Sequence, residues 1–149
     1  QRCQKQVKEA VMGMKAGSLI RPGRMRAGSP DPQKRISFSF RHIERDHQKF
    51  RYSQCEAAYF CKVIERLSAV SDFTVQEIHS GRSNSLRAHP IVWNTTSEPE
   101  GFQALNEQLR GSPPYQFSVS SNAHGRVHGF FLDHVFYVVW LDPGHCLYP

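Results

Sequence analysis

The 149-residue sequence lacks the features that define several protein classes. Its four cysteines never occur as C-x-x-C, so a zinc knuckle is not indicated, and four scattered thiols do not suggest a disulfide framework. No apolar run approaches the length of a bilayer span, and no signal peptide is visible. We therefore expect free thiols, no membrane contact and a cytoplasmic location.

Familiar catalytic motifs are also missing. No G-x-S-x-G occurs, and no Gly-rich phosphate loop is present. His42 and His47 flank the acids Glu44 and Asp46, but this spacing outside a clear helix is a weak metal signature. The expectation is that the protein uses neither a metal nor a cofactor.

Positive charge is scarce outside the first quarter of the chain. Residues 1–35 hold nine Lys and Arg against two acids, which gives +7, whereas residues 36–149 hold ten against eleven, which gives −1. Residues 1–35 thus have two interpretations: a disordered arm or non-native remnant, or a basic arm that neutralises phosphates. We expect residues 36–149 to form a single domain.

Alternation and capping patterns predict the elements of that domain. Strands are expected from Ile36 to Phe40 and from Tyr115 to Val119, where apolar residues alternate with polar ones. Ser53-x-x-Glu56 predicts a helix to about Ser68 with an apolar stripe of Ala57, Phe60, Ile64 and Leu67. Thr74-x-x-Glu77 is a weaker cap, and Ser97-x-x-Glu100 predicts a second helix that ends at Gly111.

The last residues, 126–149, are the most informative. Two strands, roughly Arg126–Leu132 and Val135–Leu141, flank Asp133-His134, which suits a tight hairpin turn. The elements together predict an α+β fold: an antiparallel sheet of about four to five strands, two main helices packed on one face, and a C-terminal β-hairpin.

A two-residue turn also fixes which hairpin residues share a face. Phe131 then faces Phe136, Gly129 faces Val138 and Val127 faces Trp140, so this face is apolar and belongs to the core. The other face gathers Arg126, His128 and Tyr137 at one end.

Arg126, His128 and Tyr137 are the leading catalytic candidates. A guanidinium binds phosphate, an imidazole transfers protons near neutral pH, and a phenol orients a reacting oxygen or stacks on a base. Such a set suits RNA cleavage by attack of the 2′-hydroxyl on the adjacent phosphorus. The plain alternative is an ordinary strand end with a tyrosine at its rim.

Further candidates lie after the hairpin and in a polar loop. His145 and Tyr148 follow the Asp142-Pro-Gly turn, where Asp142 either orients His145 or simply starts the turn. Arg82, Arg87 and His89 are candidates for contacts to phosphate, or else are merely solvated.

The order of elements from Ile36 to Tyr148, with its terminal hairpin, resembles the RelE/ParE-type toxins of bacterial toxin–antitoxin pairs. The resemblance implies a metal-independent endoribonuclease that acts on RNA and has a protein partner such as an antitoxin. It would assign phosphate binding to Arg126, acid or base catalysis to His128, and stacking or orientation of the substrate to Tyr148.

Two alternatives need no catalysis. The hairpin face of Phe130, Tyr137 and Val139 could be an exposed protein-binding surface. The basic arm alone could bind nucleic acid, with an affinity that falls steeply with salt. The endoribonuclease hypothesis instead predicts a basic cleft around Arg126, Arg82 and Arg87.

Overall fold

The computed structural model describes residues 33–81, 84–120 and 125–148. The elements in chain order are β1 (Ser37–Ser39), α2 (Ala57–Val70), α3 (Val75–His79), β2 (His89–Pro90), α4 (Glu107–Arg110), β3 (Pro114–Ser118), β4 (Arg126–Leu132) and β5 (Val135–Asp142). Short 3-10 turns lie at Tyr52–Gln54, Asn84–Leu86 and Trp93–Thr95. Most of the predicted basic arm, residues 1–32, lies outside the described residues.

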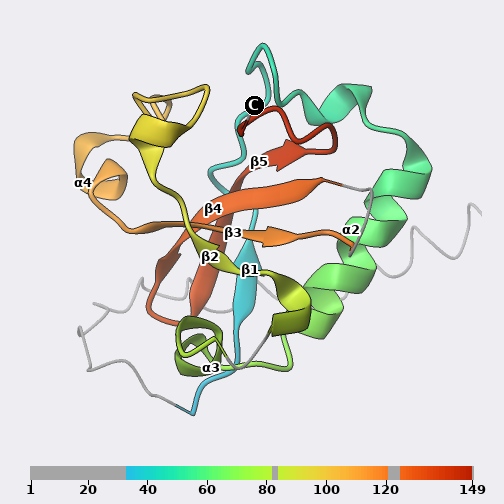
Figure 1. Cartoon of the computed structure of the whole chain (residues 1–149), viewed down its shortest axis with the longest axis vertical. Helices are drawn as coiled ribbons and strands as arrows, with labels where there is room; N and C mark the ends of the chain where they lie inside the picture. The colour runs from blue at the N-terminus through green and yellow to red at the C-terminus, as the bar shows by residue number, and fades with distance from the viewer. Residues whose placement is uncertain (1–32, 82–83, 121–124, 149) are drawn as a thin grey trace, which may run out of the picture.

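A five-stranded sheet in the order β1-β5-β4-β3-β2 organises the fold (Figure 1). Strands β2 to β5 pair antiparallel, whereas β1 pairs parallel with β5. The predicted α+β class, the five strands and the C-terminal hairpin are therefore confirmed. The sheet is mixed rather than purely antiparallel because the chain between β1 and β5 crosses over and returns in the same direction.

Apolar clusters cover both faces of the sheet, so the expectation of helices on one face needs correction. On one face, α2 and α3 pack against Phe117, Val127 and Phe136. On the other, the segment around Phe50 and the chain from Ile91 through α4 pack against Trp140 and its neighbours. Helices α2 and α4 consequently lie on opposite sides of the sheet (Figure 1).

Helix α2 begins later than its sequence pattern suggested. Ser53 lies in a 3-10 turn, the N-cap residue is Glu56, and no side-chain cap forms there. The buried stripe is Tyr59, Val63, Leu67 and Val70, which recur at helical spacing, while Ile64 is 62% exposed. The predicted stripe was thus wrong by part of a turn, although Leu67 belongs to both.

Of the two other predicted helix caps, the weaker one at Thr74 forms and the stronger one at Ser97 does not. Thr74 and Glu77 form a complete capping box at the start of α3, with Thr74 Oγ1 accepting from the Glu77 amide. The predicted helix from Ser97 was wrong: α4 is a single turn capped by Asn106, whose side chain accepts from the Leu109 amide. Ser97 instead contacts the C-terminal segment, where its hydroxyl donates to the Cys146 carbonyl.

Cys55, Cys61 and Cys146 carry free thiols; Cys3 is outside the described residues. None of the helices in the described ranges combines the length and apolar character needed to span a bilayer. Within the same ranges no three His, Cys, Asp or Glu side chains cluster as metal ligands would.

Candidate active site

A β-bulge near the middle of the β4–β5 hairpin sets the geometry of the site. The predicted pairs Phe131–Phe136 and Gly129–Val138 are present, but the register shifts between His128 and Gly129. Beyond the bulge Val127 faces Leu141 and Arg126 faces Asp142, so the predicted Val127–Trp140 pair was wrong. The extra residue places Asp142 where Leu141 was expected, because a one-residue shift changes the facing partner. We call this end of the hairpin, away from its turn, the open end.

Asp142 and His128 form a buried polar pair at the open end. The His128 Nε2 lies 3.2 Å from Asp142 Oδ2, and the two residues are 0% and 1% exposed. Burial lowers the pKa of His128 against the opposing effect of the Asp142 hydrogen bond. A neutral imidazole then donates its Nε2 proton to the carboxylate.

Asp142 also organises the chain that follows it. Its Oδ1 accepts from the Cys146 amide at 2.8 Å, and its Oδ2 accepts from the Leu147 amide at 3.0 Å. Burial alone would raise the pKa of Asp142, but the hydrogen bonds from His128 and these amides lower it below its ordinary value. The ionised carboxylate therefore holds the turn from Pro143 to Leu147 in place.

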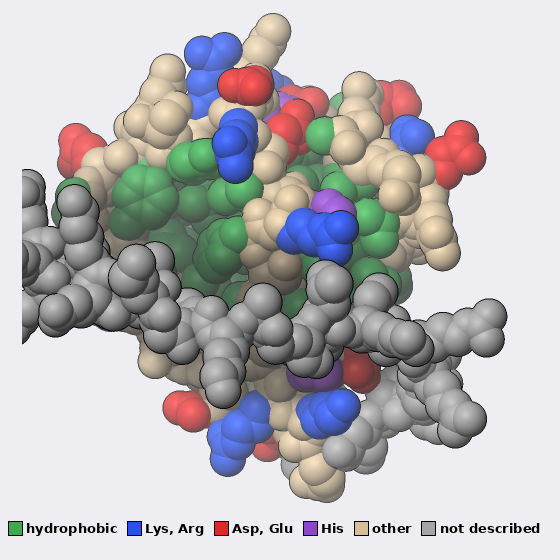
Figure 2. Space-filling model, turned by 180° about the vertical axis from the view of Figure 1, so that it is seen from behind, with side chains coloured by type: hydrophobic (Ala, Val, Ile, Leu, Met, Phe, Trp, Pro, Cys, Tyr) green, Lys and Arg blue, Asp and Glu red, His purple; other side chains and the backbone are tan. Residues whose placement is uncertain are grey.

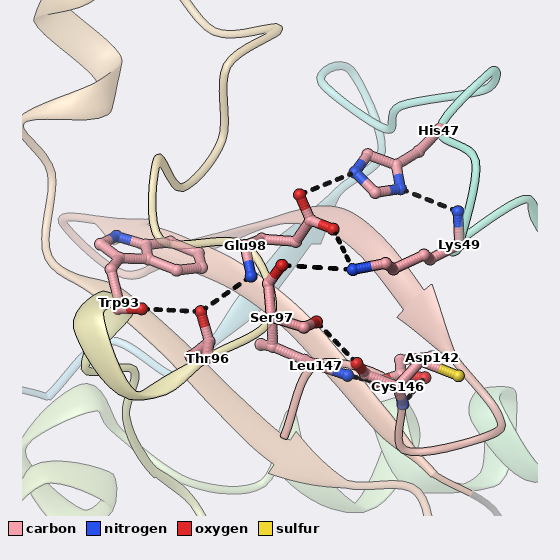
Figure 3. A network of polar contacts seen from close by, with 9 residues as sticks. All are labelled: His47, Lys49, Trp93, Thr96, Ser97, Glu98, Asp142, Cys146 and Leu147. Atoms are coloured by element: carbon pink, nitrogen blue, oxygen red, sulfur yellow. Dashed lines mark hydrogen bonds and ion pairs between the residues drawn. The ribbon is translucent and has the colours of Figure 1, made fainter. Parts of the chain in front are cut away.

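Contacts with a distant part of the chain hold the same turn from outside (Figure 3). Ser97 donates from its hydroxyl to the Cys146 carbonyl at 2.7 Å and from its amide to the Leu147 carbonyl at 2.8 Å. The Lys49 ammonium lies 2.6 Å from Glu98 Oε1 and also donates to the Ser97 carbonyl. The turn is thus fixed on both sides.

Arg126, Arg87 and His145 are electrostatic neighbours at the open end. The pKa of Arg126 is lowered by burial and by the charge of Arg87, with Asp142 acting in the opposite direction. The pKa of His145 is lowered by burial and by Arg126, again opposed by Asp142. Arg126 is half-buried, while Arg87 and His145 are exposed, so the open end presents two guanidinium groups and an imidazole to solvent.

Two of these three residues have left-handed backbones. Non-glycine residues with positive φ in the described ranges are Arg87 (46°), Asp133 (54°) and His145 (60°). Asp133 belongs to the two-residue hairpin turn, which requires positive φ. Arg87 directly follows the 3-10 turn Asn84–Leu86, and His145 lies within the turn from Pro143 to Leu147, so both occupy positions where left-handed backbones commonly occur.

Unpartnered buried polar atoms surround the His128–Asp142 pair. Gln116 Oε1, Ser118 Oγ and His128 Nδ1 have no hydrogen-bond partner among the described residues. Gln116 faces His128 and Ser118 faces Arg126 across β3 and β4, so all three atoms belong to adjacent positions of one sheet region. Such buried groups are normally satisfied, and their clustering marks this region as unusual.

The structure separates the other predicted site residues from Arg126. Tyr137 is four ladder positions away, about 13 Å at the usual rise per residue, and its ring stacks on Phe130. The Tyr148 hydroxyl accepts from the Val92 amide. His89 contacts the Gln116 amide at 3.2 Å, and Arg82 is outside the described residues.

The hairpin face is not the open surface that the sequence suggested. His128, Phe130 and Val139 are all 0% exposed beneath the second apolar cluster, which corrects the expectation of a solvent-facing sheet and of a protein-binding surface there. Large apolar side chains reach solvent elsewhere, at Phe40, Ile64, Val92 and Leu132. On the back of the molecule, hydrophobic side chains gather across the middle, and charged side chains stand mainly towards the two ends (Figure 2).

Sequence reasoning undervalued Asp142 and overlooked Gln116 and Ser118. Asp142 was visible as the start of an Asp-Pro-Gly turn, and its role depends on the bulge, which leaves no clear sequence signal. Gln116 and Ser118 looked like the solvent-facing residues of an alternating strand, yet they are 1% and 0% exposed.

Comparison with protein-family models, curated proteins and solved structures gave no match. The resemblance to RelE/ParE-type toxins therefore stays a prediction, and the geometry of the open end carries the functional argument.

Proposed function

We propose that this protein is a metal-independent endoribonuclease that cleaves RNA at the open end of the β4–β5 hairpin. The observation that carries the proposal is the meeting of Arg126, Arg87 and His145 above the buried Asp142–His128 pair. Two cations and one imidazole beside a rigid sheet are the groups that phosphodiester transfer requires.

Arg126 and Arg87 are the groups that would bind the scissile phosphate. The charge of Arg87 lowers the pKa of Arg126, because the two positive charges repel each other in the free protein. An anionic phosphate between them would relieve this repulsion, and guanidinium groups match phosphate oxygens in geometry.

His145 is the proposed proton acceptor. Because burial and Arg126 lower its pKa, its imidazole is neutral near pH 7 and can take the proton of the 2′-hydroxyl. The 2′-oxygen then forms a bond to phosphorus while the bond from phosphorus to the 5′-oxygen breaks. The leaving oxygen takes a proton from water, and the products are a 2′,3′-cyclic phosphate and a 5′-hydroxyl.

Asp142 and His128 are positioning residues in this scheme. His128 is completely buried, so it does not touch a polymeric substrate in this conformation. Its hydrogen bond helps to keep the Asp142 carboxylate in place, and Asp142 in turn fixes the backbone that directly follows His145. This assignment differs from the direct acid–base role that the family resemblance implies for His128.

The test is cleavage of end-labelled single-stranded RNA by the full chain in EDTA. We expect wild-type cleavage, and a loss of about 100-fold or more in Arg126→Ala and in His145→Ala, the range for removing a charge-stabilising or proton-transferring group. Arg110→Ala in α4 and His134→Ala at the hairpin turn are matched controls with unchanged rates. An RNA with 2′-deoxy nucleotides should resist cleavage.

Two results would contradict the proposed endoribonuclease activity. Absence of cleavage of free and ribosome-bound RNA would do so, as would cleavage that both substitutions leave intact. Salt-dependent RNA binding that Arg126→Ala weakens, without cleavage, would instead establish a non-catalytic RNA-binding module. The proposal also implies a cytoplasmic location, and an antitoxin-like protein partner stays a prediction from the resemblance.

A further inference from the structure

Ser97 contacts the backbone that directly follows His145. Its hydroxyl donates to the Cys146 carbonyl at 2.7 Å, and its amide donates to the Leu147 carbonyl at 2.8 Å (Figure 3). The two partners lie far from Ser97 in the chain. The Ser97 motif, which resembled a helix cap in the sequence, therefore serves a contact between distant segments.

The backbone of Cys146 and Leu147 is held along both of its edges. Asp142 accepts from the two amides, and Ser97 donates to the two carbonyls, so all four backbone groups are engaged. The Leu147 side chain is also fully buried in the second apolar cluster. Because Asp142 ends β5, the short stretch that ends with His145 connects two fixed points.

Ser97 is itself attached to the rest of the fold. The Lys49 ammonium donates to the Ser97 carbonyl at 3.2 Å and lies 2.6 Å from Glu98 Oε1. The other carboxylate oxygen of Glu98 is 3.9 Å from His47 Nε2. Phe50, which follows Lys49 in the chain, is 1% exposed and belongs to the same apolar cluster as Leu147. The contact from Ser97 therefore connects the turn to the core.

We propose that Ser97 is a positioning residue for His145, and that it acts by holding the Cys146–Leu147 backbone against Asp142. The role of His145 as a base rests on the proposed function. A base must lie within hydrogen-bond reach of the hydroxyl that it deprotonates, and a shift of about 1 Å caused by a distant substitution can cost about 100-fold in rate. Ser97 thus controls catalysis through the backbone, without a part in proton transfer.

The charged groups around His145 provide a readout of its position. Burial and Arg126 on β4 lower the pKa of His145, and Asp142 on β5 opposes them. His145 in turn lowers the pKa of the buried His128. Loss of the contact from Ser97 would let the imidazole gain water and move away from Arg126, so its pKa would rise towards the ordinary value. The acidic limb of the kcat profile would then move to higher pH, because the base must be neutral to act.

The experiment compares Ser97→Ala, Ser97→Thr and Thr95→Ala in the full chain. RNA cleavage in EDTA gives kcat and KM, and NMR titration of the imidazole carbon-bound protons follows His145. In Ser97→Ala we expect kcat to fall about tenfold or more with unchanged KM, and the His145 pKa to rise. Ser97→Thr keeps the hydroxyl and should behave as the wild type. Thr95→Ala removes a comparable hydroxyl bond, 2.8 Å to the Val92 carbonyl, and should change neither readout.

The two readouts separate this inference from the proposed function. A wild-type His145 titration in Ser97→Ala would overturn the positioning role, and so would an unchanged kcat in a chain that cleaves RNA; the proposed function would stand in both cases. Equal changes in Ser97→Ala and Thr95→Ala would also overturn it, because they would indicate a general effect on the fold. A His145 shift confined to Ser97→Ala would support the positioning role even if the wild type cleaves no RNA.

Discussion

The two ends of the β4–β5 hairpin follow different physical rules. At the turn end, Phe131 faces Phe136, Asp133 and His134 form an exposed 2.8 Å pair, and the register agrees with the pattern of the sequence. At the open end, a bulge shifts the register and places an ionised Asp142 and a neutral His128 out of contact with water. The turn end is specified by local chemistry, whereas the open end depends on groups from several distant segments.

Among the substitutions that test this contrast, Gly125→Ala at the open end should cause the largest loss of stability. Gly125 has φ of +72°, and an added Cβ would lie 1.8 Å from the Asp142 carbonyl oxygen. The backbone of Asp142 and Pro143 would have to move, so we expect a loss of at least about 3 kcal/mol in the free energy of unfolding, together with loss of RNA cleavage.

Gly81→Ala is the matched control for this substitution. Gly81 has φ of +73°, yet nothing lies within 4 Å of an added Cβ, so only the backbone strain contributes. Urea denaturation of both variants measures the difference. Equal losses would mean that the close approach at the open end does not matter.

Asp142→Asn should have the next largest effect. The amide cannot accept from His128, Cys146 and Leu147 together without turning a donor towards another donor, so we expect a loss of about 2–3 kcal/mol. Asp133→Asn at the turn end is the control. Its carboxylate is exposed and Asn tolerates positive φ, so the urea midpoint should not change. Similar midpoints for both variants would contradict the contrast.

The pH dependence of stability should show the smallest effect. Since the folded state lowers the pKa of His128 below its unfolded value of about 6.5, the unfolded chain binds more protons below that pH. The His128 contribution is therefore fully present above pH 6.5 and is lost as pH falls towards the folded pKa, by up to about 1.4 kcal/mol per pH unit.

Urea titrations between pH 7.5 and 5 measure this dependence. His128→Gln should flatten the slope, whereas His134→Gln at the turn end should retain it. A wild-type slope that His128→Gln leaves unchanged would show that another group causes the acid sensitivity.

Sequence periodicity gave correct predictions for elements whose structure depends mainly on their own residues. The alternation of Tyr115, Phe117 and Val119 predicted β3, and the Asp133-His134 turn predicted the hairpin. The same patterns misled where distant partners intervened. The Ser97 pattern resembled a helix start, but Ser97 bonds to the C-terminal segment instead.

The sequence identified several residues of the candidate site but did not show how they are arranged. Arg126, His128 and His145 were identified from residue type and position, and the structure brings them together around Asp142. Tyr137 was grouped with them although its predicted and observed partner Phe130 lies four ladder positions from Arg126, and Tyr148 lies after the last strand, where strand spacing does not fix its position.

The sequence by itself determined the α+β class, the terminal hairpin and the chemical character of the open end, because periodicity, turn residues and side-chain types are local properties. Only the tertiary structure decided that β1 joins β5 in parallel, that apolar clusters cover both sheet faces, and that Asp142 meets His128. Those outcomes depend on contacts between segments far apart in the chain, and a one-residue bulge was enough to exchange the residue facing Arg126.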